Sequence, residues 1–448
     1  MNGLTGKKNA GRRIGFHTFG CKLNQYETEA FASSFRSQGF TVVSADEDAE
    51  AYIVNTCTVT ARADHKARAL IRGLARGHPG SLLVVTGCSA EVEAGALSAL
   101  AKNIVVVPQS EKARLLDLPK ILGDTLGEPA GLALQSQLSA ERGPDPFAFT
   151  VKDYSFHTRA FLKIQDGCDS RCSYCRVPRA RGPSASLDAI EVTRRAVELE
   201  ALGHREIVIT GVNISAYHAA GVSLQELLRL LLNATTRVRF RLSSLEPESL
   251  TEELSRVLSH SRVCPHFHVP VQSGADSVLG RMKRRYRADQ VREGVSLLRA
   301  VKGDPFLAAD IIVGFPGETA EEFAATRSLV QALAFSALHV FPFSPRPGTP
   351  AASMTPVVAE RIRYQRAREL SALARSQAAA YARCWIGREV EVLLEDSAGP
   401  RGRGVSGNYL KVAVEDLPVS EAFSGRLARA LITAAGGLCT ARFLGYSD

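Results

Sequence analysis

The sequence predicts an α/β protein built from parallel strand–helix units, with a small β-barrel at its carboxyl end. Short apolar, β-branched runs alternate with helix-like stretches near the amino terminus, and the same alternation returns over 159–345. Such alternation indicates parallel sheets with crossover helices. From residue 386 onward, Gly-rich turns separate short strand-like runs, which is typical of a small barrel.

The first series places a cysteine at the end of each strand-like run. "RIGFHTFGC" ends at Cys21, "EAYIVNTC" at Cys57 and "SLLVVTGC" at Cys88, and a helix-like stretch follows each. The carboxyl ends of parallel strands form a ligand crevice, so we expect the three cysteines to converge at one edge. Single cysteines are often small buried apolar residues, but three at the same structural position favour a site. We assign 12–123 to a Rossmann-like or flavodoxin-like parallel α/β domain.

A Gly-, Pro- and Ser-rich linker is expected over 124–150, and a second series follows it. Its strand candidates are "RAFLKIQDG", "EIVITGVN", "RFRLSSLEP", "HFHVPVQSG", "LAADIIVGFPG" and "ALHVFPFSP". Six strand–helix repeats over 154–383 predict a full or partial TIM-type (βα)6 barrel, with its chemistry on the loops after the strands. The polar residues at those ends are Cys168, Asn213, Ser244, Glu246, Gln272 and Ser273.

The last part of the chain begins with an Arg- and Ala-rich helix expected over 361–384. Beyond it, "GREVEVLLED", "GNYLKVAVED" and "GGLCTARFLG" predict short strands. We assign 385–448 to the small β-barrel. This segment holds seven basic and eight acidic residues, so its charge does not by itself indicate an RNA-binding module.

Composition narrows the classes of protein. Hydrophobic residues make up 45% of the 448 residues and charged residues 23%, which is ordinary for a soluble globular protein. No apolar run approaches the ~20 residues of a membrane span, and no signal peptide is recognisable. We therefore expect a cytoplasmic protein without a membrane partner, whose nine cysteines stay reduced and serve metals or catalysis. The net charge of +9 favours a polyanionic partner, although a merely basic enzyme also fits.

"DGCDSRCSYC" places Cys168, Cys172 and Cys175 within eight positions. A structural zinc site normally has four ligands, and a distant residue such as His157 would have to supply the fourth. An iron–sulfur cluster is the alternative, because cysteine thiolates hold it. With three thiolates, one iron stays open to another ligand, and an open metal position marks a catalytic site.

This spacing, with Tyr174 before the last cysteine, resembles the signature of the radical S-adenosylmethionine superfamily. The resemblance implies a 4Fe-4S cluster whose open iron chelates the amino and carboxylate groups of the methionine moiety. One electron then cleaves the sulfonium and gives a 5′-deoxyadenosyl radical. The resemblance also implies that Tyr174 stacks near the adenine. From their strand-end positions and the family likeness, the other expected neighbours of S-adenosylmethionine are Gly211, Ser244, Glu246 and Gln272.

Two cysteine triads and a terminal barrel in one chain resemble the methylthiotransferase family, which has an N-terminal α/β domain, a radical domain and a C-terminal TRAM domain. The motifs are "TFGCKLNQYETE", "VNTCTVTARADHKAR", "VTGC", "DGCDSRCSYC…RARG", "ITGVN", "LSSLEP", "HVPVQSGAD", "ADIIVGFPGET" and "FSPRPGTP". The resemblance implies that Cys21, Cys57 and Cys88 hold a second 4Fe-4S cluster whose open iron carries the sulfur to be delivered. It also implies an electron donor and a sulfur source as partners.

Within this family, "TFGCKLN" followed by "ETE", together with "NTCTVT", is similar to the MtaB type. That branch attaches a methylthio group to C-2 of N6-threonylcarbamoyladenosine at tRNA position 37, with S-adenosylmethionine as methyl donor and radical source. The alternatives are isopentenyladenosine in tRNA, an aspartate of a ribosomal protein, or a non-catalytic metal-binding RNA adaptor. "RGPSAS" stands where the family commonly has "RGRSRS", and Arg176 and Arg179 replace apolar or aromatic residues, which puts the RNA contact of this loop in doubt.

The remaining motifs have simpler interpretations. The basic run "RMKRRYR" over 281–287 and the arginines of 361–383 are either solvated faces or phosphate contacts. His266 and His268 favour core or hydrogen-bonding roles over metal ligation. Cys264, Cys384 and Cys439 are most simply structural. "GFPGET" lacks the lysine of a phosphate-binding loop and is expected to be a strand-end turn.

Overall fold

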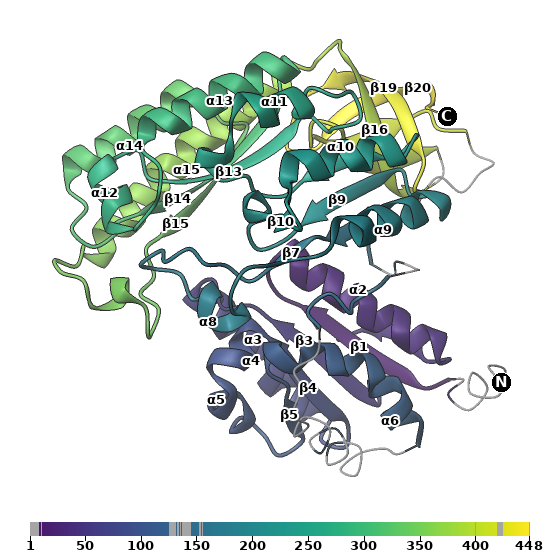
Figure 1. Cartoon of the computed structure of the whole chain (residues 1–448). Helices are drawn as coiled ribbons and strands as arrows, with labels where there is room; N and C mark the ends of the chain where they lie inside the picture. The colour runs from purple at the N-terminus through teal and green to yellow at the C-terminus, as the bar shows by residue number, and fades with distance from the viewer. Residues whose placement is uncertain are drawn as a thin grey trace. The chain divides into compact units, whose positions relative to one another are not determined.

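The computed structural model describes residues 9, 11–124, 131, 134, 136, 145–151, 154, 156–398, 400–418 and 424–447 (Figure 1). Most of the linker expected over 124–150 therefore lies outside the described residues. The chain divides into two compact units. The first contains the described residues up to Phe156, with Asp166–Ser170 and Cys175–Ala185, and the second contains His157–Gln165, Arg171–Tyr174 and the chain from Ser186 onward.

The first unit is built on a five-stranded parallel sheet. Its strands are β1 (Arg13–Thr18), β2 (Thr41–Ser44), β3 (Ala51–Thr56), β4 (Leu82–Gly87) and β5 (Ile104–Val106). The order β2-β1-β3-β4-β5 is that of flavodoxin-like folds, which confirms the predicted class. Every residue of β3 and β4 is buried, as expected for strands covered on both faces. The edge strands β2 and β5 were not predicted because each has only three or four residues.

Helices follow β1, β3 and β4 where the sequence predicts them: α2 (Lys22–Ser37), α3 (Ala61–Gly77), and α4 (Cys88–Val92) with α5 (Ala94–Ser98). The first unit also contains three helices that were not predicted, the 3-10 helix η1 (Gln109–Asp117), α6 (Leu118–Asp124) and α8 (Val177–Arg181). Thr60 caps α3, because its hydroxyl accepts the backbone N–H of Ala63 at 3.2 Å. The single helix expected over 89–100 is two short helices, α4 and α5, on either side of Glu93.

The second unit begins with six strands in two three-stranded parallel sheets. They are β6 (Ala160–Lys163), β9 (Glu206–Thr210) and β12 (Arg239–Leu242), then β13 (His266–Gln272), β14 (Phe306–Val313) and β15 (Ala337–Pro342). Isolated bridges from Phe240 to Val263 and from Ser244 to His268 connect the two sheets. The six strands thus follow one another in chain order, which confirms the predicted partial (βα)6 barrel.

Helices accompany this partial barrel, and Figure 1 shows α11, α13 and α14 beside the sheet that contains β13 and β14. The helices are α9 (Ala189–Ala201), α10 (Leu224–Ala234), α11 (Glu252–Leu258), α12 (Asp276–Arg281), α13 (Ala288–Lys302), α14 (Ala320–Leu333) and α15 (Glu360–Arg383). Shorter pieces are β7 (Gln165–Asp166), β8 (Ala185–Ser186), η2 (Ile214–Ala216), β10 (His218–Ala219), β11 (Val222–Ser223), η3 (Pro247–Ser249) and η4 (Pro350–Ser353). The "GFPGET" segment is a turn, as expected, with Gly314 and Gly317 at positive φ. Leucines at helical spacing on α10 are buried, as an amphipathic helix requires.

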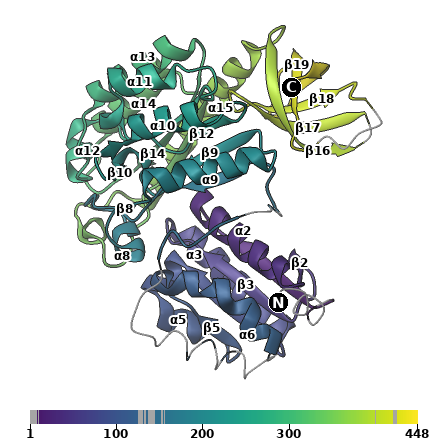
Figure 2. The same ribbon diagram turned by 45° about the vertical axis from the view of Figure 1, so that its right-hand side comes forward.

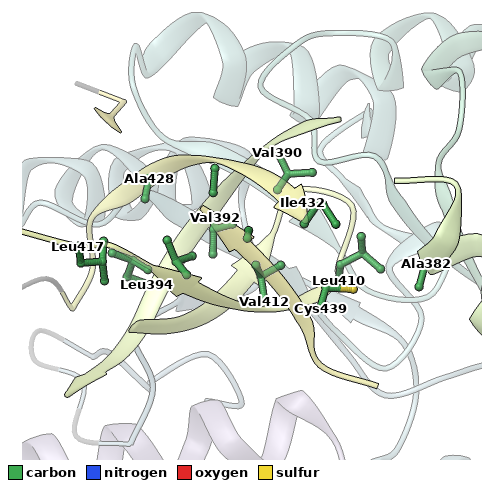
Figure 3. Close-up of a cluster of buried hydrophobic side chains, with 13 residues drawn as sticks. Ala382, Val390, Val392, Leu394, Leu410, Val412, Leu417, Ala428, Ile432 and Cys439 are labelled. Atoms are coloured by element: carbon green, nitrogen blue, oxygen red, sulfur yellow. The ribbon is translucent and has the colours of Figure 1, made fainter. Parts of the chain in front are cut away.

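The second unit ends in a closed five-stranded barrel (Figure 2). Its strands are β16 (Glu389–Ala398), β17 (Arg401–Ser406), β18 (Lys411–Glu415), β19 (Leu427–Ala434) and β20 (Cys439–Tyr446), in the order β16-β17-β18-β20-β19. Val392, Leu394, Val412 and Ile432 form part of its apolar core (Figure 3). The barrel is consistent with a TRAM-like domain. Strand β17 was not predicted because Gly402 and Gly404 interrupt its pattern, and added Cβ atoms there would lie within 2.6 and 2.0 Å of neighbours.

Among the described residues, no helix is long and apolar enough to cross a membrane.

Leu394→Ala tests the barrel core. Leu394 is fully buried, so we expect its truncation to lower the free energy of unfolding by about 2–5 kcal/mol. Trp385 is the chain's only tryptophan and packs against this core, so its fluorescence during denaturant unfolding reports on the barrel. The matched control is Leu438→Ala, because Leu438 is 44% exposed. Equal effects of the two substitutions would contradict the described core.

Candidate metal centres

The structure brings the segments bearing Cys21, Cys57 and Cys88 together at the carboxyl edge of the first unit's sheet. Cys21 immediately precedes α2, Cys57 follows β3, and Cys88 begins α4 directly after β4. The Ser89 hydroxyl donates a hydrogen bond to the carbonyl oxygen of Cys57 at 3.0 Å. A Cβ atom on Gly20 would lie 2.7 Å from the sulfur of Cys57. The three segments meet at the sheet edge where the parallel strands led us to expect them. The role of the three cysteines as metal ligands stays a prediction.

Two glycines make this convergence sterically allowed. Gly20 and Gly87 each precede a cysteine of the triad, and each has a φ of +98°. This left-handed region is costly for residues with a Cβ atom. At Gly87, a Cβ atom would also lie 2.3 Å from the carbonyl oxygen of Thr56. The backbone of "TGC" can therefore turn from β4 into α4 only because residue 87 is glycine.

The thiols of this triad are electrostatically coupled. Burial raises the pKa of Cys57 to about 12, and the neighbouring Cys21 and Cys88 add to that shift. Burial also raises the pKa of Cys88, whereas the charge of Arg181 opposes the shift. Metal binding would therefore displace protons from these thiols. The triad offers three soft sulfur donors, of which Cys21 is exposed while Cys57 and Cys88 are buried. This donor set fits an iron–sulfur cluster.

The second triad lies on the loop between β7 and α8. Cys168 and Cys175 belong to the first unit, and Cys172 belongs to the second. The sulfur of Cys168 accepts the backbone N–H of Ser170, and that of Cys175 accepts the N–H of Val177, both at 3.4 Å. Hydrogen bonds to cysteine sulfurs are characteristic of iron–sulfur sites, where they tune the reduction potential. His157, the alternative zinc ligand, packs its ring edge-on against Phe161.

Arg284 is a site residue that the sequence did not identify. Its Nη1 donates a hydrogen bond to the sulfur of Cys172 at 3.3 Å, and its Nε donates to the Tyr286 hydroxyl at 3.0 Å. Its other Nη contacts the carboxylate of Glu246. Burial raises the pKa of Glu246, and the Arg284 guanidinium opposes this shift. Arg284 therefore links a cysteine of the second triad to a predicted neighbour of S-adenosylmethionine.

The basic run 281–287 is thus not one solvated face. Arg281 forms an ion pair with Glu322 at 2.7 Å, and Arg284 has a side chain only 8% exposed, whereas Lys283, Arg285 and Arg287 are exposed. The one sequence signal for this was Tyr286, a large ring two positions after Arg284. Met282 and Tyr286 are buried and Arg284 is largely buried, whereas the residues between them are exposed. Side chains in this segment therefore alternate between the interior and the solvent.

The other expected neighbours of S-adenosylmethionine lie in the second unit at or beside strand ends. Tyr174 packs edge-on against Phe315, with ring centroids 6.3 Å apart, and its hydroxyl lies close enough to Arg284 to influence that side chain electrostatically. Gly211 lies against Gln165, whose carbonyl oxygen would be 2.9 Å from an added Cβ atom. Gln272 ends β13 with a φ of +64°. The structure therefore places Tyr174 and Glu246 around Arg284, while Gly211 stands on the β9 end.

Ser244 belongs to a separate polar group inside the second unit. Its hydroxyl is 2.6 Å from Nδ1 of His268, and Nε2 of His268 is 3.0 Å from Asp310. His339 contacts the same carboxylate oxygen at 2.9 Å. Burial alone would raise the pKa of Asp310, but hydrogen bonds from the two imidazoles lower it. His268 is thus hydrogen-bonded, and the group with Asp310 and His339 is also compact enough to hold a metal ion. His266 instead packs against Phe306 and Tyr409.

The arginines that depart from the family pattern have two different environments. Arg176 is buried in the first unit, where Nη1 donates hydrogen bonds to the Thr58 hydroxyl at 3.1 Å and to the Glu93 carboxylate at 3.0 Å. Arg179 is exposed. Of this pair, Arg179 therefore has the accessible side chain, and Arg176 is part of the packing around the first triad.

Comparisons with known proteins agree with this architecture. Residues 13–108 match the family described as "Uncharacterized protein family UPF0004", and residues 162–330 match the radical SAM superfamily. A radical S-adenosylmethionine methyltransferase, TsrM from Kitasatospora setae, superposes with a TM-score of 0.53 at 16% identity, covering 76% of this chain and 74% of that chain. At this identity the likeness shows the fold alone.

Curated relatives are similar over nearly the whole chain. A protein of Treponema pallidum (strain Nichols) is 36% identical, covering 90% of this chain and 94% of its own, and one of Bacillus subtilis (strain 168) is 34% identical, covering 94% of each. A Thermotoga maritima protein is 36% identical, covering 86% of this chain and 87% of its own. All three are named threonylcarbamoyladenosine tRNA methylthiotransferase MtaB. The chain therefore belongs to the radical SAM methylthiotransferase family of MtaB-type proteins.

Proposed function

We propose that this enzyme transfers a methylthio group to C-2 of N6-threonylcarbamoyladenosine at position 37 of tRNA, using two 4Fe-4S clusters and S-adenosylmethionine. The observation that carries the proposal is the presence of two cysteine triads in one chain of this family. One triad converges at the edge of a parallel sheet, and the other lies on the loop that follows β6, the first strand of the partial (βα)6 barrel. The relatives named for threonylcarbamoyladenosine support the choice of substrate.

The donor sets fit clusters with an open iron. Cys168, Cys172 and Cys175 would hold the radical-generating cluster, and Cys21, Cys57 and Cys88 the auxiliary one. When bound, these groups and S-adenosylmethionine supply a one-electron cleavage and a sulfur atom. The C-2–H bond of adenine has no useful acidity, so general acid–base catalysis by side chains would not activate it. A radical reaction is therefore the chemically suitable route, and three thiolates for each cluster leave the coordination position that it needs.

The chain's own residues would then bind and orient S-adenosylmethionine. Arg284 and Glu246 form a buried pair of opposite charge beside Cys172. A guanidinium and a carboxylate are complementary to the carboxylate and ammonium groups of a methionine moiety. Tyr174, held by Phe315, would form a wall beside the adenine. Gly211, Ser244 and Gln272 remain proposed neighbours from their places on the strands.

Helix α15 offers a surface for tRNA in the second unit. Its exposed arginines lie seven or eight residues apart and therefore share one face of the helix. They are Arg361, Arg368, Arg375 and Arg383. We call this face the α15 arginine stripe. Cations spaced regularly along a helix are suited to contact a phosphate backbone. The terminal barrel is nearly neutral, so its net charge does not favour such a contact. An adenine in an anticodon loop is single-stranded, so little unstacking is needed to present it.

The first prediction under this proposal concerns the substrate. Nucleosides from cells lacking this protein should contain threonylcarbamoyladenosine but no 2-methylthio derivative, as measured by mass spectrometry. The chain carrying Cys384→Ala should restore the derivative, because Cys384 is exposed and outside both triads. Restored methylthiolation of a ribosomal-protein aspartate with unmodified tRNA would contradict the proposed substrate.

Single cysteine variants distinguish the proposed functions of the two triads. Cys172→Ala should abolish both formation of 5′-deoxyadenosine and methylthiolation, because it removes a ligand of the radical cluster. Cys88→Ala should abolish methylthiolation but retain 5′-deoxyadenosine formation above half of the unmodified level. Chromatography of the anaerobic reaction measures both products. Methylthiolation by the Cys88→Ala protein would contradict a role for the first triad.

Gly87→Ala tests the steric basis of the first triad. An added Cβ atom collides with Thr56, so iron binding at this triad should fall at least fivefold. The measurement is iron per chain after anaerobic reconstitution of the variant with Cys168, Cys172 and Cys175 replaced by alanine, which should otherwise hold ~4 iron. Gly73→Ala on α3 is the control, because a Cβ atom there meets open space. Unchanged iron in the Gly87→Ala protein would contradict the geometry.

Charge reversal tests the α15 arginine stripe. The double variant Arg368→Glu and Arg375→Glu should weaken tRNA binding at least tenfold in a filter-binding assay. The slope of log affinity against log salt should become shallower by about one for each lost phosphate contact. Arg256→Glu on α11 is the control, since Arg256 is 73% exposed and lies outside the stripe. A tRNA affinity unaffected by the double variant would place the tRNA elsewhere on the protein.

A further inference from the structure

A buried network of charges lies beside the first triad, within the first unit. Its centre is Arg181, the last residue of α8, whose side chain is 2% exposed. Nη1 donates hydrogen bonds to Glu27 at 3.0 Å and to both carboxylate oxygens of Asp166, at 3.0 and 3.1 Å. Nη2 donates to Asn24 at 2.7 Å and to Glu27 at 3.2 Å. The guanidinium thus connects α2, which starts after Cys21, with Asp166 of β7, which lies two residues before Cys168.

Lys112 extends this network from the other side. Its ammonium contacts the carboxylate of Glu27 and donates to Asn55 Oδ1 at 2.8 Å. Asn55 in turn donates to the carbonyl oxygen of Asn24 at 3.0 Å. The Lys112 side chain is 1% exposed and that of Glu27 is 0% exposed. Two buried cations therefore face two buried carboxylates, and the four charges balance before any thiolate is added.

The same arginine is close to the first triad. Helix α8 packs on α4, which begins at Cys88. The charges of Arg181 and Lys112 both act on the Cys88 thiol, so the guanidinium lies near this ligand sulfur. The backbone N–H of Cys168 donates a hydrogen bond to the carbonyl oxygen of Gly182, the residue after Arg181, at 3.1 Å. The Arg181 side chain is thus near a sulfur of the first triad and is hydrogen-bonded to Asp166, two residues before Cys168 of the second triad.

We propose that Arg181 is a positioning residue that fixes the Cys168 segment against α2 and sets the reduction potential of the cluster at Cys21, Cys57 and Cys88. The inference rests on the proposed function, because it requires a cluster at this triad. Hydrogen bonds and nearby charge are known determinants of iron–sulfur potentials. A buried positive charge next to a ligand sulfur stabilises the reduced cluster, which carries one more electron, and low solvent exposure leaves this interaction poorly screened.

The sign of the effect distinguishes electrostatic tuning from loss of structure. Removing the charge of Arg181 should make the cluster harder to reduce. Removing the negative charge of Asp166, which accepts hydrogen bonds from the same guanidinium, should make it easier to reduce. General damage to the fold has no reason to shift the potential in opposite directions in these two variants. Arg181→Lys keeps the charge but loses the forked hydrogen bonds, so it separates charge from positioning.

The experiment uses the full chain with Cys168, Cys172 and Cys175 replaced by alanine, reconstituted anaerobically so that only the first triad can hold a cluster. The reduced cluster is followed by electron paramagnetic resonance during titration with a chemical reductant. In Arg181→Met, the ratio of reduced to oxidised cluster at a fixed potential should fall at least tenfold, which is ~59 mV for one electron. Asp166→Asn should raise the ratio, and Arg181→Lys should stay within threefold of the parent.

Arg194→Met is the control, because Arg194 lies on α9 in exposed ion pairs with Glu191 and Glu198, and it should leave the potential unchanged. Absence of iron from the parent variant would overturn the proposed function itself. Bound iron with a potential unmoved by Arg181→Met, or moved the same way by Arg181→Met and Asp166→Asn, would overturn this inference alone. If Arg181→Met binds no iron, the Asp166→Asn variant is the test: a cluster that is easier to reduce supports the inference, and one that is unchanged or harder to reduce contradicts it.

Discussion

The crowded edge of the N-terminal sheet is the constraint on which the rest of the site depends. Parallel strands β1, β3 and β4 end side by side, so the chain segments that follow them must share one small space. Gly20 and Gly87 permit that approach by taking positive φ values where a Cβ atom would collide with Cys57 or Thr56. Because the cysteines come directly after these turns, three sulfurs far apart in the sequence lie within electrostatic reach of one another.

Each cysteine triad also has an arginine with little solvent exposure close to one of its sulfurs. Arg181 acts electrostatically on Cys88 in the first unit, and Arg284 donates a hydrogen bond to the Cys172 sulfur in the second. Each arginine is also paired with a carboxylate, the buried Glu27 or the partly buried Glu246. Burying a charge is costly unless it is paired and hydrogen-bonded, so these contacts explain why the arginines are retained inside the protein. In the proposed clusters, they would place a positive charge beside ligand thiolates.

Periodicity predicted much of the fold, because apolar, β-branched runs such as those of β3 and β4, each followed by a helical pattern, are typical of buried parallel strands. The cysteine positions followed from the strand ends. The arginines could not be assigned in this way. Arg284 lies among other basic residues, and whether its charge meets solvent or Cys172 depends on a turn of the backbone that charge patterning does not encode. Strand β17 was missed because glycines replace its alternate side chains, a pattern that packing against neighbouring strands explains.

The proposed function requires that one chain carries two separate iron–sulfur clusters on two cysteine triads. Iron and acid-labile sulfide per chain, measured after anaerobic reconstitution of the unaltered protein, test it most directly. We expect ~8 iron and ~8 sulfide, the content of two 4Fe-4S clusters. We expect about half of each when either triad is replaced by alanine. A single zinc without sulfide, or ~4 iron that is unaffected by loss of Cys21, Cys57 and Cys88, would contradict it.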